Sequence, residues 1–152
     1  MKALRATCRR SSRGWSATVR AASFTVAFLI AAGAWAGETR ESDLGGVHIA
    51  VTPACLEEDV PLWDFAVAFQ SAGPALDDEM LASASLFVDG SAQSPIAWQE
   101  IVPSETHHRA GVLRFVAPTE ASTLVELRLR RTGEARPRVF RWYTGGWLAF
   151  AR

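Results

Sequence analysis

Apolar and polar residues alternate along most of the chain beyond residue 46, with the period of two that is typical of half-buried β-strands. The clearest case is the segment 63–69, whose large apolar side chains fall on one face: Trp63, Phe65, Val67 and Phe69. Similar short runs cover six further segments: 47–51, 86–88, 96–101, 112–116, 124–130 and 139–143. Turn-forming residues separate the runs, and Asp89-Gly90 favours a tight hairpin. The pattern predicts about seven strands.

One segment departs from the strand pattern. Residues 76–82 read Leu-Asp-Asp-Glu-Met-Leu-Ala, and we expect one short helical segment there. Short strands separated by turns at this spacing are typical of an antiparallel immunoglobulin-like sandwich. We therefore predict an all-β sandwich domain over residues 47–144. A flexible stretch over 37–46 should precede it, and residues 145–152 should form a tail or an edge strand.

The first 36 residues have a different composition. Residues 1–20 contain six basic side chains and no acid, and an uncharged, mostly apolar run follows over residues 21–36. The run ends in Ala34-Trp35-Ala36, which places small residues at both positions that a signal peptidase reads. A membrane-spanning helix needs about 20 apolar residues, more than this run supplies. We predict a cleavable signal peptide over 1–36 and a periplasmic or secreted protein, with an uncleaved anchor as the alternative.

Removal of this segment changes the charge of the chain. The whole sequence has 16 basic and 16 acidic residues, but six of the basic ones precede residue 37, so the mature chain has a net charge of −6. Nucleic acid is therefore not an expected partner, because phosphate binding needs a basic face. The acids concentrate in residues 37–105 and the arginines in 106–152. We expect the two halves to interleave and pair across strands, in preference to an anion-binding face.

Cysteine use is sparse. After removal of the signal only Cys55 remains, so the mature chain cannot form an internal disulfide. Its apolar neighbours predict a buried and inert thiol.

Sequence signatures of the common enzyme classes are absent. The chain has no G-x-S-x-G elbow, no phosphate-binding glycine loop and no H-E-x-x-H motif. We predict that the protein is not an enzyme and needs no cofactor.

Three histidines are the candidate metal ligands: His48, His107 and His108. Imidazole binds copper and zinc ions well, so a copper or zinc site is the alternative to a chain without cofactor. Adjacent residues of an extended chain point to opposite faces, however, so the two neighbouring histidines should diverge. We prefer a structural role, in which the pair braces the loop that enters the 111–117 strand.

A further pattern combines several of these segments. Trp63-Asp-Phe-Ala-Val, the Leu76–Leu81 segment, Trp98 and the block His107-His108-Arg-Ala-Gly-Val-Leu-Arg-Phe115 resemble a family of small exported bacterial and archaeal proteins of unknown function. The resemblance covers residues 60–142. Thr106 stands where that family has a glycine, and Ala72 stands near a family histidine. The resemblance implies an exported β-rich protein and no particular activity.

Two functions follow as hypotheses. The first is an exported, non-catalytic sandwich that acts as a binding or structural module of the cell envelope, with a protein or envelope component as its partner. Trp147 and Arg109 are its candidate contact residues. The second is a periplasmic metal-binding domain that uses the His107/His108 pair. Neither hypothesis involves insertion into a membrane after the signal is removed.

Overall fold

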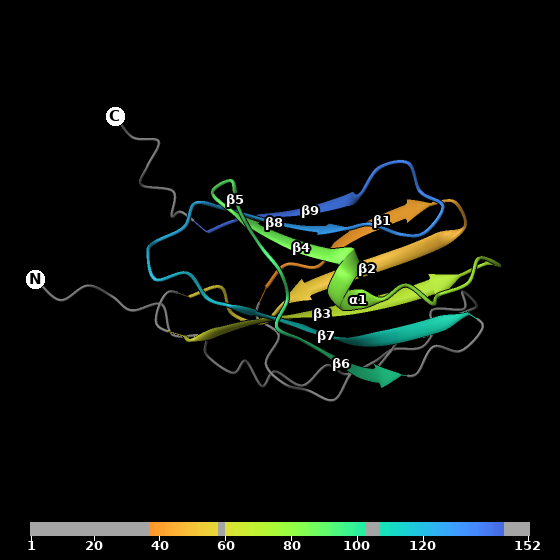
Figure 1. Cartoon of the computed structure of the whole chain (residues 1–152), viewed down its shortest axis with the longest axis horizontal. Helices are drawn as coiled ribbons and strands as arrows, with labels where there is room; N and C mark the ends of the chain where they lie inside the picture. The colour runs from red at the N-terminus through yellow and green to blue at the C-terminus, as the bar shows by residue number, and fades with distance from the viewer. Residues whose placement is uncertain (1–36, 58–59, 103–106, 145–152) are drawn as a thin grey trace, which may run out of the picture.

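The computed structural model describes residues 37–57, 60–102 and 107–144. Within these ranges the chain forms nine strands and one short helix (Figure 1). In chain order these are β1 (Arg40–Leu44), β2 (Val47–Pro53), β3 (Leu62–Ser71), α1 (Met80–Ser83), β4 (Ala84–Val88), β5 (Ser91–Gln93), β6 (Ala97–Val102), β7 (His108–Val116), β8 (Leu124–Leu129) and β9 (Arg138–Tyr143).

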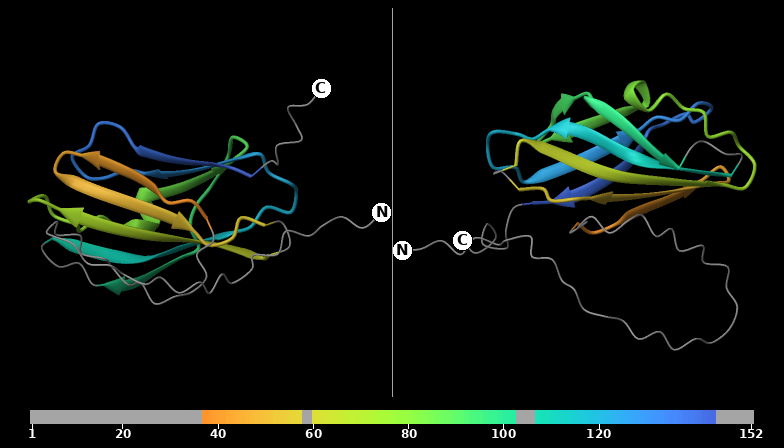
Figure 2. Two further views of the ribbon diagram at one scale, coloured as in Figure 1. Left: turned by 180° about the vertical axis from the view of Figure 1, so that it is seen from behind. Right: turned by 90° about the horizontal axis from the view of Figure 1, so that it is seen from below.

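The strands form two antiparallel sheets, stacked as two layers (Figures 1 and 2). Sheet A has the strand order β1-β2-β3-β7-β6, and sheet B has the order β5-β4-β8-β9. The prediction of an all-β antiparallel sandwich is confirmed, although the described chain contains nine strands and not about seven.

The core lies between the two sheets and is built from alternate residues of the long strands. In β3 the side chains of Trp63 and Phe65 are completely buried, whereas Asp64 between them faces the outside. The ring of Phe65 packs edge-on against Phe115 of the same sheet, with 5.7 Å between ring centroids. It also contacts Trp142 of the opposite sheet at 5.6 Å. These aromatic contacts join the two layers.

Three elements differ from the sequence prediction. Residues 40–44, predicted to be flexible, form β1, which pairs with β2 along its whole length. The three-residue strand β5 was not expected and follows the predicted Asp89-Gly90 turn, where both residues have a positive φ as a type I′ hairpin turn requires. The helix is a single turn at 80–83 and begins later than predicted, because Glu79 acts as its N-cap and accepts from the Leu81 N–H.

The residues before the helix are extended because Asp78 is used elsewhere. Its carboxylate is buried and accepts from Arg131 Nε at 2.7 Å and from the Thr132 backbone N–H at 2.8 Å. Burial alone would raise the pKa of Asp78, but the hydrogen bonds from Thr132 and Arg131 outweigh it and lower the pKa. This ion pair fastens the segment between β3 and α1 to the end of β8.

Candidate functional site

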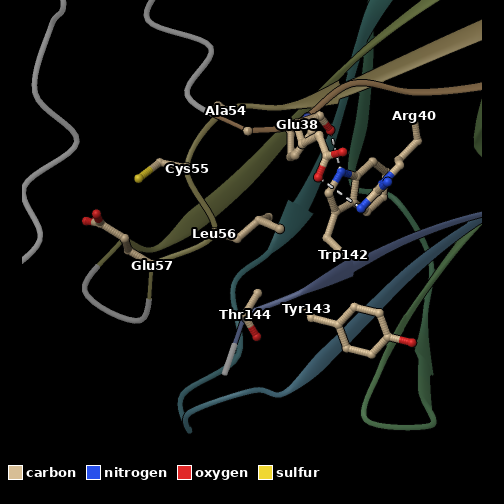
Figure 3. Close-up of a pocket in the computed structure, with 11 residues that line it drawn as sticks. Glu38, Arg40, Ala54, Cys55, Leu56, Glu57, Trp142, Tyr143 and Thr144 are labelled. Carbon is tan, nitrogen blue, oxygen red and sulfur yellow. Dashed lines mark hydrogen bonds and ion pairs between the residues drawn. The ribbon is translucent and has the colours of Figure 1, made fainter. Parts of the chain in front are cut away.

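The candidate site is a groove of about 510 Å³ at one end of the sandwich. Three separate segments line it: residues 37–40 before and within β1, residues 53–57 after β2, and residues 142–144 at the end of β9 (Figure 3). We call this the seam groove, because β1 and β9 are the edge strands of the two sheets and meet here without pairing through their backbones.

Side chains hold the two walls of the seam groove together. The Trp142 indole donates from Nε1 to the Glu38 carbonyl oxygen at 2.6 Å, and Arg40 Nε donates to the Arg141 carbonyl oxygen at 3.0 Å. Arg40 also forms an ion pair with the Glu38 carboxylate, with 3.0 Å between Nη2 and Oε2 (Figure 3). The groove is therefore a preformed depression whose walls are fixed on both sides.

The lining combines apolar and charged groups. Trp142 is almost completely buried, and Leu56 extends from the opposite wall into the same space, whereas the carboxylate of Glu57 points away from it (Figure 3). Tyr143, at the rim, is 73% exposed. A concave, partly apolar surface with a few fixed polar groups is typical of a binding site for a small molecule or an extended peptide.

Cys55 lies in this lining but does not behave as predicted. Its residue is only half-buried, and its side chain points away from Trp142 (Figure 3). The predicted burial of Cys55 is therefore wrong. The other cysteine of the sequence, Cys8, lies outside the described residues.

The three histidines lie at the opposite end of the sandwich. His107 precedes β7, and its Nδ1 lies 3.2 Å from the Ser71 carbonyl oxygen, while its own carbonyl accepts from the Ser71 N–H. His108 begins β7 opposite Gln70, whose other neighbour across the sheet is His48. His48 and His108 thus occupy one row on the outer face of sheet A, separated by one strand. His48 Nδ1 lies 2.8 Å from Asp43 Oδ1, on the side away from His108.

No group of three or more His, Cys, Asp or Glu side chains suited to a metal ion occurs within residues 37–57, 60–102 and 107–144. The register explains why the histidines do not form one. It places β3 between His48 and His108, and it directs His107 toward the backbone of Ser71.

The two candidate contact residues have different outcomes. Trp147 lies outside the described residues. Arg109 is opposite the buried Phe69 and faces inward, with a side chain that is only 11% exposed. It donates to Glu100 Oε1 at 2.7 Å and to the Asp78 carbonyl oxygen at 2.6 Å, and it lies 5.4 Å from the centre of the Trp98 ring. Arg109 therefore braces β6 and the segment before α1 and is not a surface contact.

The acidic and basic halves of the sequence do interleave. Three ion pairs join them across the fold: Asp64–Arg114, Glu100–Arg109 and Asp78–Arg131. Other arginines pair within their own half, and the arrangement around Glu126 on sheet B is described below.

The described residues contain no helix that is long and apolar enough to cross a membrane.

Comparisons with protein-family models, with curated proteins and with solved structures each found no match to this chain, so the family resemblance described above stays a prediction.

Proposed function

We propose that the protein is an exported, non-catalytic β-sandwich module of the cell envelope, which binds a protein or another envelope component through the seam groove. The observation that carries this proposal is the groove itself, a concave surface with an apolar floor and fixed charged walls. The basic and then apolar pattern of residues 1–36 supports export to the periplasm or the outside.

The edge strands at the groove favour an extended partner. Edge strands carry backbone groups that can pair with another chain, and many proteins bind extended peptides in this way. β9 pairs only with β8 among the described strands, and the Arg141 carbonyl on its other side is occupied by Arg40. An extended segment that lies in the groove would therefore contact Tyr143 of β9 and the following Thr144 on one side and Leu56 on the other.

Location is tested first. Expression of the full chain in a bacterial host, followed by fractionation and N-terminal sequencing, should give a periplasmic or secreted protein that begins at Gly37. Retention of Met1 on a protein that stays in the cytoplasm would contradict export.

The groove is tested by filling it. Ala54 lines the groove, so Ala54→Arg should block the partner, whereas Ala135→Arg places the same side chain on an exposed turn far from the groove in the sequence. A photo-crosslinking residue at Leu56, whose side chain extends into the groove, should capture a partner in cells, and the same residue at the exposed Gln99 of β6 should not. Capture that persists in the Ala54→Arg chain, or that is equal from both probe positions, would contradict binding at the groove.

A further inference from the structure

The outer face of sheet B carries an unusual concentration of arginine. Phe87 of β4, Glu126 of β8 and Arg141 of β9 lie in one row across three strands. Arg128 is two positions from Glu126 on β8 and therefore shares its face. Among the residues of β4, β5, β8 and β9, Glu126 is the one acid. The strands of this sheet thus present more positive than negative charge.

Glu126 holds the two arginines in place. Its Oε1 accepts from Arg141 Nε at 2.5 Å, and its Oε2 accepts from Arg128 Nη2 at 2.8 Å. The guanidinium of Arg128 also lies over the Phe87 ring, 3.8 Å from the centroid. We call Arg128, Glu126 and Arg141 the arginine clamp. One carboxylate faces two guanidinium groups, so the clamp retains a net positive charge.

The clamp is both fixed and accessible. The Glu126 side chain is only 11% exposed, whereas those of Arg128 and Arg141 are 37% and 56% exposed. Each arginine uses one N–H group for Glu126, and Arg128 Nε is buried without a hydrogen-bond partner among the described residues, but more than a third of each arginine side chain is exposed. Because the arginines are already oriented, an anion that binds them loses little side-chain entropy.

Apolar and aromatic groups surround the clamp on the same face. Tyr143 and Val139 flank Arg141 on β9 and are both exposed, and Tyr143 lies opposite Leu124 of β8. Arg130 extends the basic row beyond the end of β8 and is exposed as well. Basic side chains next to an exposed tyrosine are the combination that suits the headgroup region of an anionic membrane, where arginine meets phosphate and tyrosine lies at the interface.

We propose that the outer face of sheet B docks on an anionic lipid surface, with the arginine clamp binding lipid phosphate groups and Tyr143 lying among the headgroups. Charge complementarity carries the assignment, because this face is positive whereas the other exposed charged side chains of the described residues are largely acidic. The contact is peripheral. It shares Tyr143 with the rim of the seam groove, but Arg128 and Arg141 do not line the groove, so the two proposals can fail separately.

The test measures sedimentation of the full chain with lipid vesicles. Vesicles that contain phosphatidylglycerol should bind the chain, and vesicles of phosphatidylcholine alone should bind it much less. The double variant Arg128→Gln/Arg141→Gln should bind anionic vesicles roughly 30-fold more weakly, since each basic residue near such a surface contributes about fivefold. Arg114→Gln is the matched control, because it removes an equally ion-paired arginine from the outer face of sheet A.

One comparison between variants and one further measurement keep the result interpretable. Residues 1–36 are basic and apolar and are present in every variant, so the difference between the double variant and Arg114→Gln isolates the clamp. Tyr143→Ala should weaken vesicle binding severalfold without a change in melting temperature, because this side chain is exposed.

Equal binding by the double variant and the Arg114→Gln control would overturn the proposal, as would equal binding to the two kinds of vesicle. A last experiment uses inorganic phosphate as a competitor of the lipid. If millimolar phosphate protects the clamp against heat and removes the chain from vesicles completely, the clamp is a site for free phosphate and the lipid assignment is wrong.

Discussion

The outer faces of the two sheets use the same contact to different effect. On sheet A, Arg114 of β7 binds Asp64 of β3 through two parallel hydrogen bonds of 2.7 and 2.8 Å, so one cation meets one anion. On sheet B, the two oxygens of Glu126 are divided between Arg128 and Arg141. The first arrangement is electrically neutral and the second is not. Ion pairs between strands can therefore complete a face or leave it charged, depending on how many cations share one carboxylate.

The two faces also differ in the side chains around these contacts. The centre of sheet A carries a row of alanines, Ala50, Ala68 and Ala110, on three neighbouring strands. Sheet B carries Phe87, Val139 and Tyr143 around its clamp. The second face combines a net positive charge with an exposed tyrosine.

The largest expected effect comes from a substitution in the core between the two sheets. Trp63→Ala should lower the free energy of unfolding by about 3–5 kcal/mol, because the indole is completely buried and donates to the Glu57 carbonyl oxygen. Asp64→Ala, at the next residue, removes a pair that is partly exposed and should cost about 1 kcal/mol or less. Urea unfolding measures both, and a Trp63→Ala chain as stable as the wild type would contradict this assignment of inner and outer faces.

A smaller effect separates the two faces directly. Glu126→Gln leaves two neighbouring arginines without their shared carboxylate and should cost about 2 kcal/mol, since hydrogen bonds to charged groups are the stronger kind. Asp64→Asn leaves one more exposed arginine and should cost less. Equal losses in urea unfolding would show that the clamp is no more than an ordinary surface pair.

The ion pairs of Glu126 should also make the stability of the fold sensitive to acid. Hydrogen bonds from Arg141 and then Arg128 lower the pKa of Glu126 below its usual 4.5. A carboxyl group with a lowered pKa stabilises the fold above its unfolded pKa, and this stabilisation is lost as the pH falls through the folded value. The stability of the wild type should therefore decline as the pH falls below about 4.5.

Glu126→Gln provides the control for this acid dependence. It should remove part of the decline, and Asp78, whose pKa is lowered from 3.8, should account for a further part. Urea unfolding between neutral pH and pH 3 tests this expectation, which identical pH profiles for wild type and variant would refute.

The smallest expected effect concerns Val139, which is exposed on β9 beside the clamp. Val139→Ala should change the free energy of unfolding by about 0.5 kcal/mol or less, as is usual for surface positions. A much larger loss in thermal or urea unfolding would mean that the apolar groups of this face are packed in the solution structure.

The sequence predicts those strands whose alternation is driven by burial. β3 and β8 alternate clearly because one face of each packs into the core, and the Asp89-Gly90 turn has its own backbone signature. β1 was missed because Arg-Glu-Ser-Asp-Leu has no apolar face; its place is set by pairing with β2 and by side chains from β9.

The candidate site was harder to predict for a related reason. The seam groove joins three segments that are remote in sequence, and its position depends on β1. Trp142 belongs to the predicted strand run 139–143, but nothing in the pattern shows that its indole N–H reaches Glu38. Arg109 was predicted to be a candidate contact residue, and the register with Phe69 turns its side chain inward.

The contact between β1 and β9 has a consequence for how the chain folds. Trp142 and Glu38 are 104 positions apart, and Arg138 reaches back from β9 to the carbonyl oxygens of Ser42 and Leu44. Contacts of such long range form late and slow the folding of β-proteins. Until β9 has left the ribosome, β8 lacks one of its two neighbouring strands and Phe65 lacks the Trp142 ring. Of the described strands, β9 is therefore the last to be synthesised and the one that completes the core, so a chain that is still emerging keeps the inner faces of both sheets partly uncovered.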